Sequence, residues 1–156
     1  MRSPVTPLSP NDLVPLDGVR VKFARVWLVG SGFIFFIMVI QSLRGVYADK
    51  TQEAWGWFLP TVLPSLLLIM GVLTYTALDP NATNTLVRRT FVPIALWLSI
   101  AYIFTVLLTI LMQPFAGTKP DDAIALMRTS NLWLGPFQGL VSSALGVLFV
   151  SKQKHP

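Results

Sequence analysis

Long apolar stretches without a charged residue alternate with short polar segments, and every Lys, Arg, Asp and Glu lies outside the apolar stretches. A helix that crosses the hydrocarbon core of a membrane needs about 20 mainly apolar residues. No stretch shows the alternation of polar and apolar residues that is typical of a membrane β-barrel. The pattern therefore predicts an all-α integral membrane protein with four transmembrane helices, at about residues 26–43, 57–78, 91–112 and 132–150.

The composition favours the same class of protein. Hydrophobic residues make up 53% of the 156-residue chain and charged residues only 12%, whereas soluble domains have about 25% charged residues. So few charges cannot cover the surface of a soluble domain of this size. The net charge of +5 is scattered along the chain, which argues against nucleic acid and favours a lipid bilayer with anionic headgroups as the partner.

The first 18 residues show neither helical nor strand periodicity. Pro4, Pro7 and Pro10 recur every three residues, which is the period of a polyproline II helix. We therefore expect residues 1–18 to form an extended, Pro-rich arm ahead of one transmembrane domain, residues 19–156. The arm could dock into an aromatic groove of a partner, or its prolines could simply keep it disordered.

The basic residues predict the orientation, because segments that stay in the cytoplasm are enriched in Lys and Arg. Eight basic residues lie in the N-terminal segment, the connection between the second and third spans, and the tail, against four in the other two connections. Both termini are therefore expected in the cytoplasm, and in a bacterium the membrane would be the inner one. Long cationic side chains near span ends are expected to reach lipid headgroups; these are Arg20, Lys22, Arg25, Arg88, Arg89, Lys152 and Lys154.

The predicted spans lack the residue types that most membrane enzymes and cofactor-binding proteins use. They contain no ionisable acid or base, and the chain contains no cysteine. A charge at mid-membrane is costly and usually marks a functional site. The single histidine, His155, is the penultimate residue, so haem ligation or general-base chemistry inside the membrane is not expected. We predict no enzymatic activity, no cofactor and no metal.

The connection before the fourth span contains a helix-start pattern. Pro120 is followed by Asp121 and Asp122, and proline and acids are favoured in a first helical turn. Residues 121–130 could lie flat on the membrane or lengthen the fourth helix, and the sequence leaves both open.

The fourth span carries small residues at helical spacing. Gly135, Gly139 and Ser143 share one helix face, and Ser142 and Gly146 form an adjacent pair. Small residues let helix backbones approach closely in a membrane. They predict either an association seam with another copy or a partner subunit, or packing against the other three spans of the same chain.

The second span contains Pro60 and Pro64. Each proline removes a backbone donor, so the second helix is expected to be kinked. The kink could be a hinge that lines a cavity, or a fixed bend that shapes the bundle.

Two functions fit these features. The favoured hypothesis is a non-catalytic, small multi-pass membrane protein that assembles with itself as a homo-oligomer or with a larger membrane complex. The alternative is an oligomeric channel or membrane-permeabilising pore effector lined by the uncharged polar residues of the spans, because a pore can select or gate without charges.

Overall fold

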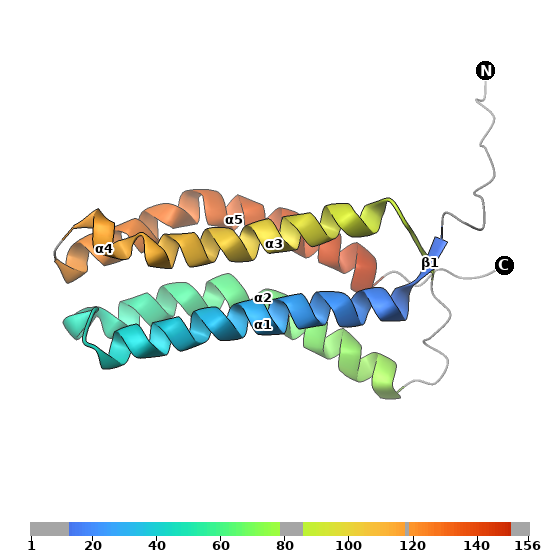
Figure 1. The fold of residues 1–156 in the computed structure, drawn as a ribbon, viewed down its shortest axis with the longest axis horizontal. Coiled ribbons are helices and arrows are strands. Elements are labelled where there is room, and N and C mark those ends of the chain that lie inside the picture. Colours follow the sequence, from blue (N-terminus) through green and yellow to red (C-terminus); the bar gives the residue numbers. More distant parts are fainter. Residues whose placement is uncertain (1–12, 79–85, 118, 151–156) are drawn as a thin grey trace, which may run out of the picture.

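The computed structural model describes residues 13–78, 86–117 and 119–150, and most of the expected Pro-rich arm lies outside them. Within the described residues, four helices are long and apolar enough to span a membrane. They are α1 (Leu16–Leu43), α2 (Thr51–Leu78), α3 (Phe91–Leu111) and α5 (Pro120–Val150), and they run along the long axis of the molecule (Figure 1). The predicted class, an all-α membrane protein with four candidate spans, is confirmed.

The two ends of the bundle differ in their short elements. One end, called the loop end here, contains the 3-10 helix η2 (Ala48–Lys50) and the short helix α4 (Gln113–Ala116). The other, called the terminal end, contains the start of α1, the end of α5 and the passage from α2 to α3 (Figure 1). Because the number of spans is even, the start of the first long helix and the end of the last one lie at the same end of the bundle.

A two-stranded antiparallel ribbon begins the described chain at the terminal end. Strand β1 (Leu13–Pro15) pairs with β2 (Leu86–Arg88), and Val14 lies opposite Val87. Helix α1 then begins at Leu16, whose side chain is buried in the core. Residues 13–18 of the expected arm therefore belong to β1 and the first turn of α1.

Helix α5 resolves the alternative that the sequence left open for residues 121–130. The helix runs without interruption from Pro120 to Val150, with Asp121 and Asp122 in its first turn. Residues 121–130 therefore lengthen the fourth helix. Proline supplies a helical φ angle at the start, and the two carboxylates face the positive end of the helix dipole.

The core is built by side chains from all four long helices, and α5 packs most extensively against α2 and α3. The largest fully buried side chains include Trp27, Ile69, Tyr102 and Leu145. The outer surface is also apolar, and Trp97 is 71% exposed on it. Apolar side chains on the outside are unfavourable in water but match the hydrocarbon of a bilayer, as a membrane-spanning bundle requires.

Candidate functional site

Helix α2 receives hydrogen bonds from two other helices at its prolines. Pro64 has no N–H, so the carbonyl of Pro60 loses the donor that an α-helix would supply four residues later. The side-chain Nε2 of Gln138, from α5, lies 3.3 Å from the Pro60 carbonyl oxygen and 3.2 Å from that of Thr61. The hydroxyl of Tyr102, from α3, donates to the same Thr61 oxygen at 2.8 Å. The proline segment is therefore satisfied by α3 and α5.

Tyr102 lies at the centre of the bundle. Its side chain is fully buried, and its ring contacts Trp27 of α1, with centroids 5.9 Å apart. It also meets Phe137 of α5 edge-on, at 5.5 Å and 88°. Through these rings and its hydroxyl, Tyr102 contacts each of the other three long helices.

The small residues of the predicted seam face outward. Gly135, Gly139 and Ser143 are exposed, while Ser142 and Gly146 are half-buried. A Cβ atom added at any of the three glycines would meet nothing within 4 Å among the described residues. Packing within the chain therefore does not require glycine at these positions.

At Gly30 of α1, in contrast, packing within the bundle does require glycine. A Cβ atom added there would lie 2.8 Å from the side chain of Ile103 of α3, too close for a real contact. The small residues at helical spacing lie on α5, but the close approach of two helices within the chain is at Gly30 of α1.

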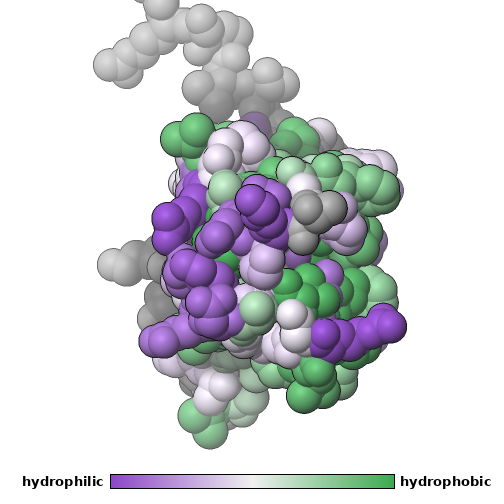
Figure 2. Space-filling view, turned by 90° about the vertical axis from the view of Figure 1, so that its left-hand side faces the viewer, coloured by the Kyte–Doolittle hydropathy of each residue, from purple (hydrophilic) through white to green (hydrophobic). Residues whose placement is uncertain are grey.

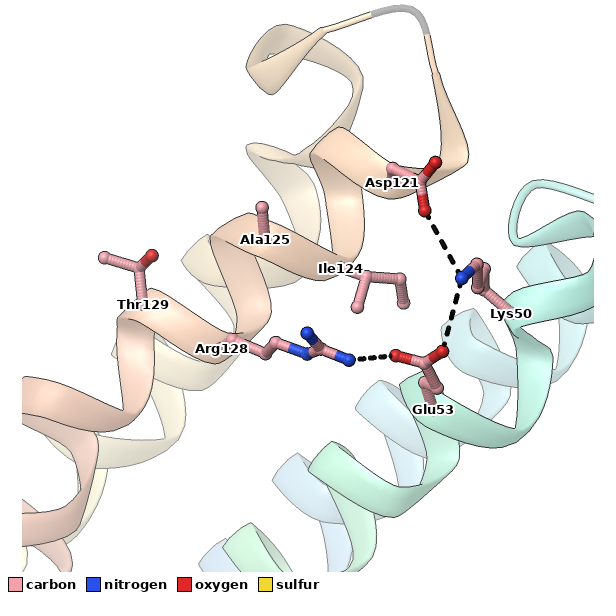
Figure 3. Close-up of a pocket in the computed structure, with 7 residues that line it drawn as sticks. All are labelled: Lys50, Glu53, Asp121, Ile124, Ala125, Arg128 and Thr129. Carbon is pink, nitrogen blue, oxygen red and sulfur yellow. Dashed lines mark hydrogen bonds and ion pairs between the residues drawn. The ribbon is translucent and has the colours of Figure 1, made fainter.

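Charged side chains form a cluster at the loop end, between α2 and α5. Lys50 Nζ lies 3.5 Å from carboxylate oxygens of both Glu53 and Asp121, and Arg128 pairs with Glu53 from the other side (Figure 3). They border a cavity of about 370 Å³ whose remaining lining is Ile124, Ala125 and Thr129. Figure 2 views this end face-on and shows hydrophilic residues gathered beside apolar ones.

Each cation in this cluster already has a carboxylate partner, so the cluster is balanced in charge. Such exposed pairs contribute little to stability, because water and salt screen them. Among the described residues, no group of three or more His, Cys, Asp or Glu is placed to hold a metal ion. The sequence could show that Lys50 and Glu53 share a helix face, but not that α5 lies opposite them.

A buried hydrogen-bond network lies at the loop end. The hydroxyl of Tyr47 approaches the side-chain oxygens of Gln41 and Gln113, the latter at 3.0 Å, and the sulfur of Met38 at 3.2 Å. One phenolic hydrogen cannot serve two amide oxygens. Rotating the Gln113 amide by half a turn removes the conflict, because its Nε2, which has no partner among the described residues, then donates to Tyr47.

Burial also changes the acidity of Tyr47, which lies between α1 and η2. Desolvation disfavours the charged phenolate and raises the pKa of Tyr47 to about 12, although the hydrogen bond with Gln113 acts in the opposite direction. Tyr47 is therefore a neutral hydrogen-bonding group at any physiological pH.

Arg20 differs from the expected headgroup anchor, because its side chain is only 6% exposed. Its Nη2 donates to the carbonyl oxygen of Phe149 at 3.2 Å, and its Nη1 lies 3.9 Å from Asp17. The last turn of a helix leaves carbonyls without helical donors and carries partial negative charge. Arg20 supplies a donor and a positive charge there. Apolar residues at the same spacing, Val21 and Leu28, flank Arg25, so the sequence alone does not show that Arg20 is the cation that turns inward.

The other predicted anchors that the structure describes are exposed at the terminal end. Lys22 and Arg25 lie near the start of α1, and Arg88 and Arg89 lie before α3. Their contact with lipid headgroups stays a prediction. Lys152 and Lys154 lie outside the described residues.

Fold and exterior together define the class of this chain: a multi-pass membrane protein with four long apolar helices. Comparisons with protein-family models, curated proteins and solved structures give no match to it, so its function is inferred from its own residues.

Proposed function

We propose that the protein is a non-catalytic membrane component that assembles with a second copy of itself, or within a larger membrane complex, through the outward face of α5. The observation that carries the proposal is the exposure of Gly135, Gly139 and Ser143. An exposed glycine inside a helix costs about 1 kcal/mol relative to alanine. Packing within the chain does not require glycine at these positions. A helix of a second copy or of a partner that packs closely against them would require it.

The surroundings of this face suit helix association. Leu132, Leu140 and Val147 are exposed beside the small residues, so a partner helix that approaches the small residues would also contact larger apolar side chains. Ser143 donates to the carbonyl of Gly139 at 2.8 Å, which satisfies its hydroxyl and leaves only its small volume for a neighbour. In lipid, such close packing drives association because apolar surface alone gives no advantage.

The remaining parts of the chain act as a scaffold in this proposal. The prolines bend α2, and the donors from Tyr102 and Gln138 hold the bend in one geometry rather than leaving it as a hinge. The terminal end is cytoplasmic, which is supported by the exposed cations Lys22, Arg25 and Arg88 at that end.

Copy number in lipid tests the proposal directly. Fluorescently labelled full-length chain would be diluted into liposomes, and subunits counted by single-molecule photobleaching. We expect dimers or larger assemblies for the natural sequence and monomers for Gly139→Leu. Gly71→Leu is the matched control: Gly71 of α2 is equally exposed and open, but the residues four positions before and after it are Leu67 and Tyr75, so it belongs to no face of small residues. Monomers at every dilution, or an unchanged assembly in Gly139→Leu, would overturn the proposal.

The absence of cysteine allows a second, independent test. A cysteine introduced as Ser143→Cys is the only thiol in the chain, so an oxidised dimer reports that two α5 faces meet. Thr74→Cys places a thiol on the exposed surface of α2 in the same half of the bundle and should cross-link weakly. Equal cross-linking of the two variants would indicate random collision.

A further inference from the structure

Many side-chain hydroxyls in the long helices donate to a backbone carbonyl three or four residues earlier, the usual arrangement in a membrane helix. Eight described residues do so; these are Ser42, Thr51, Thr61, Thr76, Thr105, Thr109, Ser130 and Ser143. Ser31, Ser65 and Ser99 do not. Their hydroxyls are buried, at 5%, 2% and 1% exposure, and have no hydrogen-bond partner among the described residues.

These three serines come from three different helices but lie around one residue, Tyr102. Ser99 is one turn before Tyr102 on the inward face of α3. Ser65 is one turn after Thr61, whose carbonyl accepts from the Tyr102 hydroxyl. Ser31 is one turn after Trp27, whose ring contacts that of Tyr102. Residues four apart on a helix are neighbours about 5–6 Å apart, so each of the three hydroxyls lies within about one helical turn of Tyr102 or of a residue that Tyr102 contacts.

Trp27 adds a fourth group of the same kind. Its side chain is fully buried, and its indole Nε1, which can only donate, has no acceptor among the described residues. Its ring contacts that of Tyr102, which is eleven residues into the uncharged helix α3 and therefore roughly 16 Å along that helix from its first residue. That is about half the thickness of the hydrocarbon core, where no bulk water reaches.

Ser65 shows why the helix itself does not satisfy this centre. The carbonyl one turn before Ser65 belongs to Thr61 and already accepts from Tyr102 and from Gln138. Its two lone pairs are therefore in use. Donors from α3 and α5 occupy the carbonyl oxygen of Thr61, and the hydroxyl of Ser65 is left without an acceptor among the described residues.

We propose that the centre of the bundle binds ordered water, held by Trp27 Nε1 and the hydroxyls of Ser31, Ser65 and Ser99. A buried water typically makes about three hydrogen bonds to otherwise unsatisfied groups. Water can accept from the indole N–H and donate to the hydroxyl oxygens. Leaving four buried polar groups without partners in a membrane interior would be far less favourable than ordering water there.

Transfer of magnetisation from water provides the test, with the full chain in lipid bilayers and solid-state NMR of the tryptophan indole groups. The Trp27 signal is assigned by its loss in Trp27→Phe. We expect the Trp27 indole to receive magnetisation from water at least several-fold faster than that of Trp97, which is 71% exposed toward lipid and nearer to its helix start. Equal or slower transfer at Trp27, or contact with lipid protons in place of water, would overturn the proposal.

Stability measurements on a serine variant give an independent reading. Ser99→Ala removes a ligand of the water, so we expect its unfolding midpoint to fall by about 2–4 °C. If the centre were dry, removal of an unsatisfied hydroxyl would leave the midpoint unchanged or raise it, and the proposal would be wrong. Thr74→Ala, at an exposed hydroxyl of α2 outside the proposed association face, is the control and should change little.

Discussion

Arg20 Nη2 lies 3.2 Å from the carbonyl oxygen of Phe149, so the beginning of α1 is bonded to the end of α5. The guanidinium is buried on the inward face of its helix, and its Nε has no partner among the described residues. A charged donor on a helix C-terminus is a strong interaction because the carbonyls there lack helical partners. This contact closes the terminal end of the bundle.

Arg20→Met keeps the apolar stem and removes the charged donor, so it should weaken the terminal end. We expect a loss of about 1–3 kcal/mol in the free energy of unfolding, measured by unfolding in mixed micelles. Amide exchange should rise in the last turn of α5. Lys22→Met, at an exposed position two residues away, is the control, and equal losses in both variants would show that the Phe149 contact is not the cause.

Gln138→Leu should destabilise the bundle by about 0.5–2 kcal/mol, because the Pro60 carbonyl loses its donor in the membrane interior. Pro64→Ala restores the backbone N–H that normally bonds this carbonyl. The cost of Gln138→Leu should therefore be smaller when Pro64→Ala is already present. A double-mutant cycle measures this coupling, and additive effects of the two substitutions would contradict the assignment.

Tyr47 should make the loop end sensitive to alkaline pH. Its folded-state pKa of about 12 lies above the ordinary value of 10.0, so the folded state favours the protonated phenol. The stability linked to this proton is fully present below about pH 10 and is lost as the pH rises through about 12. Tyr47→Phe has no such proton. The difference in unfolding free energy between the natural chain and Tyr47→Phe should stay constant to about pH 10 and shrink above it, whereas a constant difference up to pH 12 would be inconsistent with a buried Tyr47.

Liposomes that contain the protein should remain impermeable to ions and small dyes. The interior of the described bundle is filled by large side chains from all four long helices, so a single chain offers no continuous aqueous path. Leakage would be measured as dye release at increasing protein density, against protein-free liposomes. Release that grows steeply with density and disappears in Gly139→Leu would instead support the oligomeric pore.

The helices could be predicted from sequence because a membrane span is indicated by consecutive residues alone, without knowledge of contacts between distant parts of the chain. A run of about 20 apolar residues is sufficient, and the helix start at Pro120 could be read from the proline and acids that follow it. Arg20 was harder to place. It belongs to a basic cluster with Lys22 and Arg25, and nothing in that cluster indicates which cation turns inward until the buried positions of α1 are known.

The direction in which each helix face points could not be read in the same way. Lipid-facing and core-facing side chains are equally apolar here, so the pattern that separates inside from outside in a soluble helix is weak. Gly30 and Gly139 look alike in sequence, yet one touches α3 and the other lies on the surface. The contact between Gln138 and Pro60 joins residues 78 positions apart, and no local signal identifies such a pair.

The contact between Arg20 and Phe149 has a consequence for the order of synthesis. The two residues are 129 positions apart, and a ribosome makes the chain from its N-terminus. Arg20 emerges with the first helix, long before its acceptor exists, and a charge is costly in hydrocarbon until it is paired. The bond between Arg20 and Phe149 therefore forms only after the last turn of the fourth long helix has been made, so the contact that closes the terminal end of the bundle is among the last to form.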